Sequence, residues 1–139
     1  MASDTRRESL DRLPTHFRDW VGDARIEEVE CIVADIAGVS RGKAMPFAKF
    51  AREDRMFLPV TIFHQTISGD YVHMDIENQW KESDMVLLPD HSSGTAAPWA
   101  DDVTLQVIHD AVDLTGAPVR VAPRNLLKRV IALYEAEGW

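Results

Sequence analysis

The sequence has one cysteine, Cys31, among its 139 residues, so no disulfide can form within the chain. Basic residues are also few: 15 Lys and Arg stand against 23 Asp and Glu, which gives a formal net charge of -8. A charge of this sign repels the phosphates of nucleic acids and anionic lipids. Nothing near the N-terminus has the basic-then-apolar order of a signal peptide. These scarcities favour a cytoplasmic protein that binds neither nucleic acid nor a membrane.

Long apolar runs are missing as well. The run around Val86-Leu87-Leu88 falls far short of the ~20 residues that a membrane helix needs. No Gly/Ser/Pro-rich linker divides the chain, and the hydrophobic (45%) and charged (27%) fractions are those of an ordinary globular protein. The chain is therefore expected to fold into a soluble domain with a sizeable core.

Periodicity and turn residues predict the elements of the first half. Apolar residues at helical spacing predict a helical segment over 5–21, in which Pro14 either kinks one helix or lies in the first turn of a second. A β-branched run predicts a central strand over 28–36. Gly38 and Gly42 supply the positive-φ positions of a tight connection, and a strand over 43–47 returns from it. Pro46 restricts that returning strand to an edge or an end.

The later elements follow from the same signals. The expected segments are a short helix over 48–55, a strand over 56–67 broken at Pro59, a turn over 68–71, a strand over 85–88, a loop over 91–97 and a strand over 104–113. Asp113 and Gly116 suit a turn, and Pro118 opens the partner strand of a second hairpin. Pro123 begins a helix whose one apolar face runs to Gly138. This order of elements predicts an α+β fold.

Few residues carry recognisable chemistry. The five histidines and the lone cysteine have no metal-ligand spacing, and there is no phosphate-cradling glycine loop or nucleophile elbow. Arg41 and Lys43 flank Gly42 and suit an anion, but a solvated turn is the favoured reading of two such cations. Trp80 and Trp99 lie in loop-like segments, where each either marks a contact surface or caps the core.

Five short sequence motifs then follow one another along the chain. They are Asp35-Ile36-Ala37-Gly38-Val39-Ser40-Arg41-Gly42-Lys43, Glu82-Ser83-Asp84-Met85-Val86-Leu87-Leu88-Pro89-Asp90, Pro98-Trp99, Asp113-Leu114-Thr115-Gly116-Ala117-Pro118 and Ala122-Pro123-Arg124-Asn125-Leu126-Leu127. Together they resemble the N-terminal domain of the glutamine synthetase family, in particular its branch of γ-glutamyl-amine-forming ligases.

The resemblance implies a β-grasp domain, a mixed sheet packed on helices. The expected organisation is an N-terminal helical segment over 1–25, the β-grasp domain over 26–121 and a helix over 122–139 that leads toward a catalytic domain absent from this chain. In the family that catalytic domain holds ATP, Mg²⁺ or Mn²⁺ and glutamate. No cofactor is expected on this chain itself.

The resemblance also implies one site residue. The family's N-terminal domain contributes a loop aspartate that binds and deprotonates the incoming ammonium in an active site shared between neighbouring subunits of a ring. Counting back from Glu82-Ser83-Asp84 places Asp70 at that position. The chain reads Ser68-Gly69-Asp70-Tyr71 where the family has Asp-Gly-Ser-Ser, which favours an amine larger than ammonia. The competing interpretation makes Asp70 a turn residue only.

Two functions from different classes follow. In the first, the chain is the N-terminal domain of an ATP-dependent glutamate–ammonia or glutamate–amine ligase. It is inactive alone, and Trp80, Trp99, Arg41 and Lys43 are candidates for contacts with neighbouring subunits. In the second, it is a free-standing β-grasp module that binds or regulates other proteins.

Overall fold

The computed structural model describes residues 10–21, 25–53, 55–71 and 83–139. Contacts within the chain divide it into two compact units, each assembled from segments that are separate in the sequence. Unit 1 comprises Met1–Ile32, Gly42–Met56 and Leu88–His109, and unit 2 comprises Val33–Arg41, Phe57–Leu87 and Asp110–Trp139. The predicted domain boundaries near residues 25 and 121 stay a prediction.

Helices and strands are interspersed along the described chain. The helices are α2 (Thr15–Val21), α3 (Phe47–Glu53) and α4 (Pro123–Ala136), with 3-10 turns η1 (Val60–His64) and η2 (His91–Ser93). The strands are β1 (Glu28–Ala34), β2 (Ser40–Pro46), β3 (Met56–Pro59), β4 (Asp84–Pro89), β5 (Thr95–Ala96) and β6 (Thr104–Val112). The predicted α+β class is confirmed.

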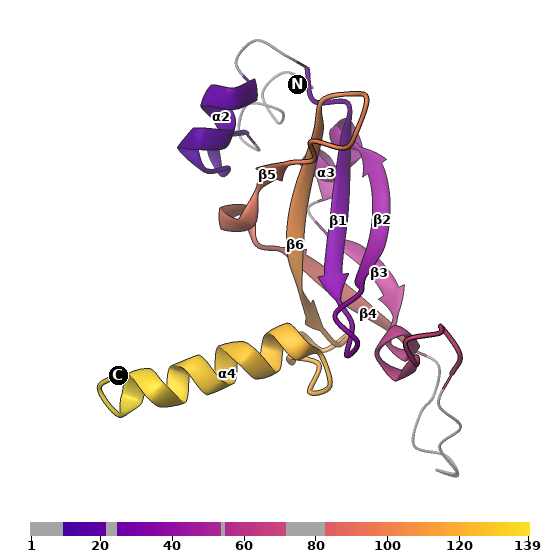
Figure 1. Cartoon of the computed structure of the whole chain (residues 1–139), viewed down its shortest axis with the longest axis vertical. Helices are drawn as coiled ribbons and strands as arrows, with labels where there is room; N and C mark the ends of the chain where they lie inside the picture. The colour runs from indigo at the N-terminus through magenta and orange to yellow at the C-terminus, as the bar shows by residue number, and fades with distance from the viewer. Residues whose placement is uncertain (1–9, 22–24, 54, 72–82) are drawn as a thin grey trace. The chain divides into compact units, whose positions relative to one another are not determined.

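The strands form a six-stranded mixed sheet in the order β2-β1-β6-β4-β3, with β5 paired to β6. β1 runs parallel to β6, with Glu28 opposite Thr104 and Ile32 opposite Ile108. Figure 1 shows β1 between β6 and β2, which confirms β1 as an interior strand. β2 ends the order, as the presence of Pro46 predicted.

The core of unit 1 comes from alternate positions on these strands. Val29 and Cys31 of β1 and Leu105 and Val107 of β6 are fully enclosed, as the period of two in a half-buried strand requires. Helix α3 adds Phe50, whose ring meets the ring of His109 on β6 edge-on, with centroids 6.3 Å apart. Burying such rings and aliphatic groups stabilises the fold by about 25 cal/mol per Å² of apolar surface.

The first connection is the predicted hairpin, with one correction. Gly38 has φ of 78°, the left-handed conformation expected of it. Gly42 does not have a positive φ; it lies on β2, where a Cβ would stand 1.9 Å from the carbonyl oxygen of Cys31. Gly42 is therefore required by the close approach of two strands, and not by a turn.

A Gly42→Ala substitution is expected to destabilise the chain by about 1–3 kcal/mol, because the atom that blocks the new methyl group is backbone and cannot swing away. The free energy of unfolding in urea measures this cost. Ser40→Ala, on the same strand at an exposed position, serves as the control and should stay within about 0.5 kcal/mol of the wild type. Equal stability of the two variants would contradict the steric explanation.

The N-terminal helical segment begins anew after Pro14. Helix α2 starts at Thr15, and the N–H of Arg18 donates to the Pro14 carbonyl oxygen at 3.1 Å. Of the two predicted alternatives the structure has the second helix, with Pro14 directly before its first residue. A proline fits there because its missing N–H is not needed in the first turn.

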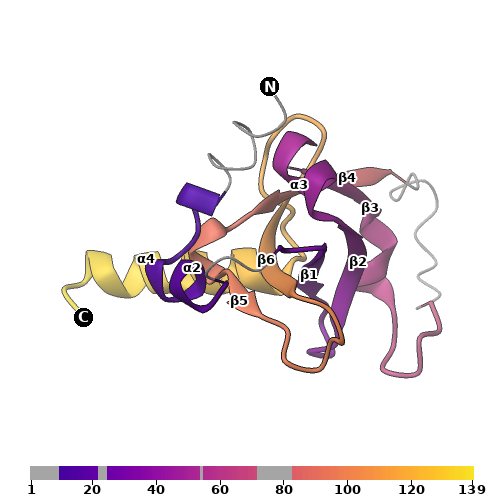
Figure 2. The ribbon, with the colours of Figure 1, turned by 90° about the horizontal axis from the view of Figure 1, so that it is seen from above.

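The segment 91–97 was predicted to be a loop, and this was wrong. It contains η2 and β5, and Figure 2 shows β5 beside β6. The Asp90 carboxylate accepts from the N–H of Ser92 at 3.1 Å, and the N–H of Ile108 donates to the Ser93 hydroxyl at 2.8 Å. The Ser93 contact holds the segment against β6, and Thr95 and Ala96 then pair with β6. Composition alone cannot signal so short a strand.

The predicted second hairpin is reduced to a turn and one bridge. Val112 pairs with Pro118 as an isolated bridge, and no return strand follows it in the described residues. Pro118 has no N–H for a ladder. The backbone then turns through Val119 and Ala122 into α4, which leaves no length for a strand.

Helix α4 begins and ends as predicted. Pro123 occupies its first turn, and Gly138 follows its end with φ of 84°. No side chain of α4 is buried, however, and the predicted apolar face is open to solvent. The exposed apolar residues are Leu126, Leu127, Val130, Ile131, Leu133 and Tyr134. None of the helices within the described residues is long and apolar enough to cross a membrane.

Candidate functional site

The turn that carries Asp70 is closed by its own hydrogen bonds. The N–H of Thr66 donates to the Asp70 carbonyl oxygen at 2.8 Å, and the N–H of Gly69 donates to the Thr66 carbonyl oxygen at 2.9 Å. Gly69 has φ of 89°, a conformation that glycine adopts without the cost of a side chain. Gln65 and Tyr71 pair at its base. The predicted turn over 68–71 is therefore part of a short hairpin over 65–71.

The Asp70 carboxylate lies exposed beside the turn of this hairpin, where Asp70 is hydrogen-bonded to Thr66. Its Oδ2 accepts from the Ser68 hydroxyl at 2.8 Å, and the Ser68 and Thr66 hydroxyls are themselves 2.8 Å apart. These hydroxyls orient the carboxylate. Two neighbouring side chains offer exposed apolar surface: Ile67 is 82% exposed and Tyr71 is 57% exposed. A carboxylate so placed can bind a cationic group carried by an alkyl chain, with the charge on Asp70 and the chain along its apolar neighbours.

Arg41 belongs to a different constellation, centred on Asp35. The Asp35 carboxylate is buried; its Oδ1 accepts from the N–H groups of Ala37 at 2.9 Å and Val39 at 2.8 Å. Its Oδ2 accepts from Arg41 Nε at 2.8 Å. Burial alone raises the pKa of this carboxyl, but the hydrogen bonds from Arg41, Val39 and Ala37 outweigh burial, so the pKa lies below its ordinary value.

The positions of Arg41 and Lys43 correct the sequence interpretation. Both lie on β2, and the turn itself is formed by residues before Ser40. Arg41 is not a solvated turn cation, because its guanidinium neutralises the buried Asp35. Its structural role is thereby defined, whereas a role for Arg41 or Lys43 in contacts between subunits stays a prediction.

Trp99 lies on the surface of unit 1, with 64% of its area exposed. Its indole N–H donates to Glu30 Oε1 at 3.1 Å, and Gln106 donates to the second oxygen of Glu30 at 2.9 Å. The indole N–H is therefore anchored to Glu30 while most of the side chain stays exposed. Trp99 does not cap the core; its role at an interface stays a prediction. Trp80 lies outside the described residues.

Other reactive groups are enclosed. Burial raises the pKa of the Cys31 thiol to about 12, so the thiol stays protonated and is a poor nucleophile. His109 is buried, with Nδ1 3.0 Å from the Val107 carbonyl oxygen. In the part of the chain that the structure describes, no three His, Cys, Asp or Glu side chains gather in a way that could hold a metal ion.

Comparisons with known proteins point to one family. No protein-family model matches the chain. The chain is 31% identical over 132 residues to human lengsin and 30% identical over 127 residues to glutamate–isopropylamine ligase of a Pseudomonas species. These matches cover 89% and 88% of this chain. Gamma-glutamylputrescine synthetase of Escherichia coli strain K12 is 29% identical over 104 residues, 73% of the chain.

The fold agrees with these matches. A crystal structure described as a novel glutamine synthase homolog superposes on 81% of the chain with a TM-score of 0.68, at 20% identity. The chain belongs to the glutamine synthetase family. It spans about a quarter of the length of the curated relatives that it matches, 25% of lengsin and 28% of the isopropylamine ligase. The sheet described above is thus the N-terminal domain of a glutamine-synthetase-like protein.

Within this member of the glutamine synthetase family, three of the predicted site residues each bind groups in their own surroundings. The hydrogen bonds of Asp70 go to its own turn, those of Arg41 go to Asp35, and the indole of Trp99 is bound to Glu30. The sequence interpretation missed Asp35, although an aspartate three residues before Gly38 is a turn signal that could have revealed it.

Proposed function

We propose that the chain is the part of an ATP-dependent glutamate–amine ligase that presents Asp70 to an active site completed by a neighbouring subunit of a homo-oligomeric ring. Family membership supports the ligase reaction. The exposed carboxylate of Asp70 on the 65–71 hairpin carries the proposal for this chain, because a group that serves a second subunit has to be accessible from outside its own.

Asp70 would act on the amine substrate in two steps. The carboxylate first holds the protonated amine by charge. It then accepts one proton from that ammonium group, and this leaves an uncharged nitrogen whose lone pair attacks the γ-carboxyl carbon of glutamate, previously phosphorylated at the expense of ATP. The C–N bond forms as the bond from that carbon to the phosphate oxygen breaks, and inorganic phosphate leaves. The Ser68 hydroxyl, which donates to Oδ2, orients the carboxylate toward the amine.

ATP and a divalent metal belong to the proposed reaction but not to the described residues. No described group of three acidic or imidazole side chains suits a metal ion. When bound elsewhere in the protein, these groups would supply activation of the γ-carboxyl. The role of the present chain is confined to binding the amine and making contacts within the ring, for which Trp99 and the open face of α4 are the candidates.

The amine is proposed to carry an alkyl group. Two relatives are named for isopropylamine and for a putrescine product, and neither name refers to ammonia. The apolar surfaces of Ile67 and Tyr71 beside Asp70 suit an alkyl substituent. The full reading frame that contains this chain, given ATP, glutamate and a panel of ammonia, isopropylamine and diamines, should release phosphate fastest with an alkylamine.

The isolated chain is expected to release no phosphate from ATP under the same conditions, because phosphoryl transfer needs metal-bound phosphates. Phosphate release is measured for the purified chain with and without magnesium and with the preferred amine. The full reading frame is the positive control. Magnesium-dependent release by the chain alone would contradict the proposed division of roles.

A second function, a free-standing interaction module, is supported by two exposed features. The exposed indole of Trp99 and the open apolar face of α4 are both typical of surfaces that bind other proteins. The gene distinguishes the two: a reading frame that continues beyond Trp139 into a catalytic domain supports the ligase, and a stop codon there supports the module.

A further inference from the structure

The segment around the start of α4 has a charge opposite to that of the whole chain. Between Asp113 and Glu135 the sequence has no acidic residue, although the chain as a whole carries a net charge of -8. The basic residues of that stretch are Arg120, Arg124, Lys128 and Arg129. Such a local excess of cations gives this segment a positive potential.

One carboxylate neutralises only part of this charge. Asp110 at the end of β6 accepts from Arg124 Nε at 2.8 Å through Oδ1, and Lys128 binds its other oxygen. The side chains of Arg120 and Arg129 have no ion pair or hydrogen bond with any residue in the described ranges. Two guanidinium groups are thus left to interact with a ligand or with water.

Both arginines line the same hollow, whose volume is about 650 Å³. Lys128 is a third cation at its wall, and no carboxylate lines it. Pro118, Val119 and Leu126 supply apolar surface. Sites for small molecules have roughly this size, about 300–1,000 Å³, with apolar walls and a few polar groups.

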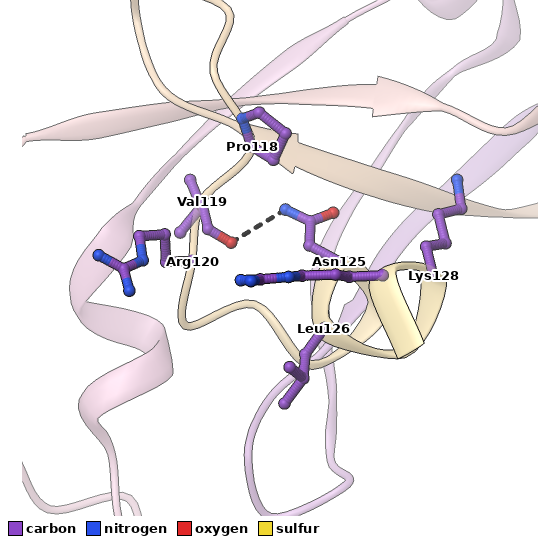
Figure 3. A pocket seen from close by; sticks show the side chains of 7 residues that line it. Pro118, Val119, Arg120, Asn125, Leu126 and Lys128 are labelled. Carbon is purple, nitrogen blue, oxygen red and sulfur yellow. Dashed lines mark hydrogen bonds between the residues drawn. The ribbon is translucent and has the colours of Figure 1, made fainter. Parts of the chain in front are cut away.

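The hollow is held open by fixed contacts. The Asn125 side-chain amide donates to the carbonyl oxygens of Ala111 at 2.6 Å and Val119 at 3.0 Å. The N–H of Val119 donates to the Ala111 carbonyl oxygen at 3.0 Å. Figure 3 shows Asn125 bound to Val119, with Arg120 on one side, Lys128 on the other and Leu126 below. The walls are therefore preorganised by α4 and the segment before it.

We propose that this hollow binds a small organic anion: a carboxylate, sulfonate or phosphate group carried on a flat apolar body. The guanidinium groups of Arg120 and Arg129 bind the anionic group, and Pro118, Val119 and Leu126 contact the body. A guanidinium suits this task because it stays charged and donates in a planar fork. The site lies apart from the 65–71 hairpin in the sequence and does not depend on the proposed ligase reaction.

The test uses two dyes that differ in one group. The purified chain is titrated with 1-anilinonaphthalene-8-sulfonate and, separately, with N-phenyl-1-naphthylamine, which has the same ring system without the sulfonate. The sulfonate is expected to bind one site about tenfold more tightly, the effect of one charge-assisted contact, and more weakly as salt rises. Inorganic phosphate should compete with it. Equal affinity of the two dyes overturns the proposal.

Variants then locate the site. Arg120→Ala/Arg129→Ala should weaken sulfonate binding at least about tenfold and leave binding of the uncharged dye unchanged. Arg52→Ala/Arg55→Ala is the matched control, since it removes the same charge from exposed positions outside the hollow. Wild-type affinity in the pocket variant would refute the assignment. So would altered self-association of that variant with unaltered dye binding, because the arginines would then bind carboxylates of a second copy.

A measurement on the unaltered chain keeps the test valid if the variant fails to fold. The side-chain amide of Asn125 gives its own pair of NMR signals, and its position in the wall should make these shift on addition of the sulfonate dye. Signals of the amide of Gln65, at the base of the 65–71 hairpin, should stay in place. If the signals of the Asn125 side-chain amide do not shift at a saturating concentration of the sulfonate dye, the proposal is overturned.

Discussion

Asp70→Asn in the full reading frame is expected to lower the amine-dependent kcat/KM by about 10²–10⁴, the usual contribution of a general base. Asparagine keeps the size of the side chain but can neither hold an ammonium group by charge nor accept its proton. The affinities for ATP and glutamate should change little, because these substrates bind elsewhere in the proposal. Steady-state kinetics with each substrate varied in turn separate the effects.

Two further variants sharpen this test. Asp101→Asn removes the same charge from an exposed loop of unit 1 and should leave kcat/KM unchanged. Ser68→Ala removes the hydroxyl that donates to Oδ2 of Asp70 and should lower the amine-dependent kcat/KM by less than Asp70→Asn does, since the carboxylate and its charge remain. If Asp70→Asn matches the wild type in amine-dependent kcat/KM, Asp70 is a turn residue only and its alignment with the family's aspartate is misplaced.

Asp35→Ala is expected to cost about 3 kcal/mol of stability, the lower end of the range for removing one partner of a buried ion pair. The lower end applies because Arg41 retains 29% exposure of its side chain and can turn toward water. Three donors lose their acceptor at once: the Arg41 guanidinium and the N–H groups of Ala37 and Val39. Urea unfolding at neutral pH should show a midpoint lower by roughly 1–2 M.

The pH dependence of this difference follows from the lowered pKa of Asp35. The folded state binds the Asp35 proton less tightly than the unfolded chain, so the carboxylate stabilises the fold fully above its ordinary pKa of 3.8. That stabilisation is lost as the pH falls below 3.8 toward the pKa of the folded state. The gap between wild type and Asp35→Ala should therefore narrow at acid pH. A gap that is constant from pH 7 to pH 3 would rule out the ion pair as its cause.

A double-mutant cycle identifies the partner. Arg41→Ala leaves a buried carboxylate with only its two backbone donors and should be destabilising by a similar amount. Asp35→Ala/Arg41→Ala should cost less than the sum of the single variants, because the second change removes a group that is already unpaired. Additive costs would show that the two side chains act independently, against the geometry described above.

Local signals in the sequence determined much of this molecule. Asp35 and Asp113 each stand three residues before a glycine, and both glycines have positive φ, 78° at Gly38 and 89° at Gly116. In both turns the aspartate caps the backbone N–H groups two and four residues later. Pro123 and Gly138 bound α4 for equally local reasons. These features depend on dihedral preferences and donors a few residues apart, which the residue types alone define.

The tertiary structure decided what depends on distant segments. Strand β5 exists because Ser93 and β6 meet across 15 residues, and Gly42 is required because β2 passes over Cys31. The second hairpin ends at one bridge because α4 begins directly after it. Arg120 and Arg129 line one hollow only because Asn125 ties the Val119 segment to the helix. Sequence spacing predicts local structure. Strand pairing and cavities depend on contacts between distant segments, and the entropy cost of closing the loops between those segments is offset only in the complete fold.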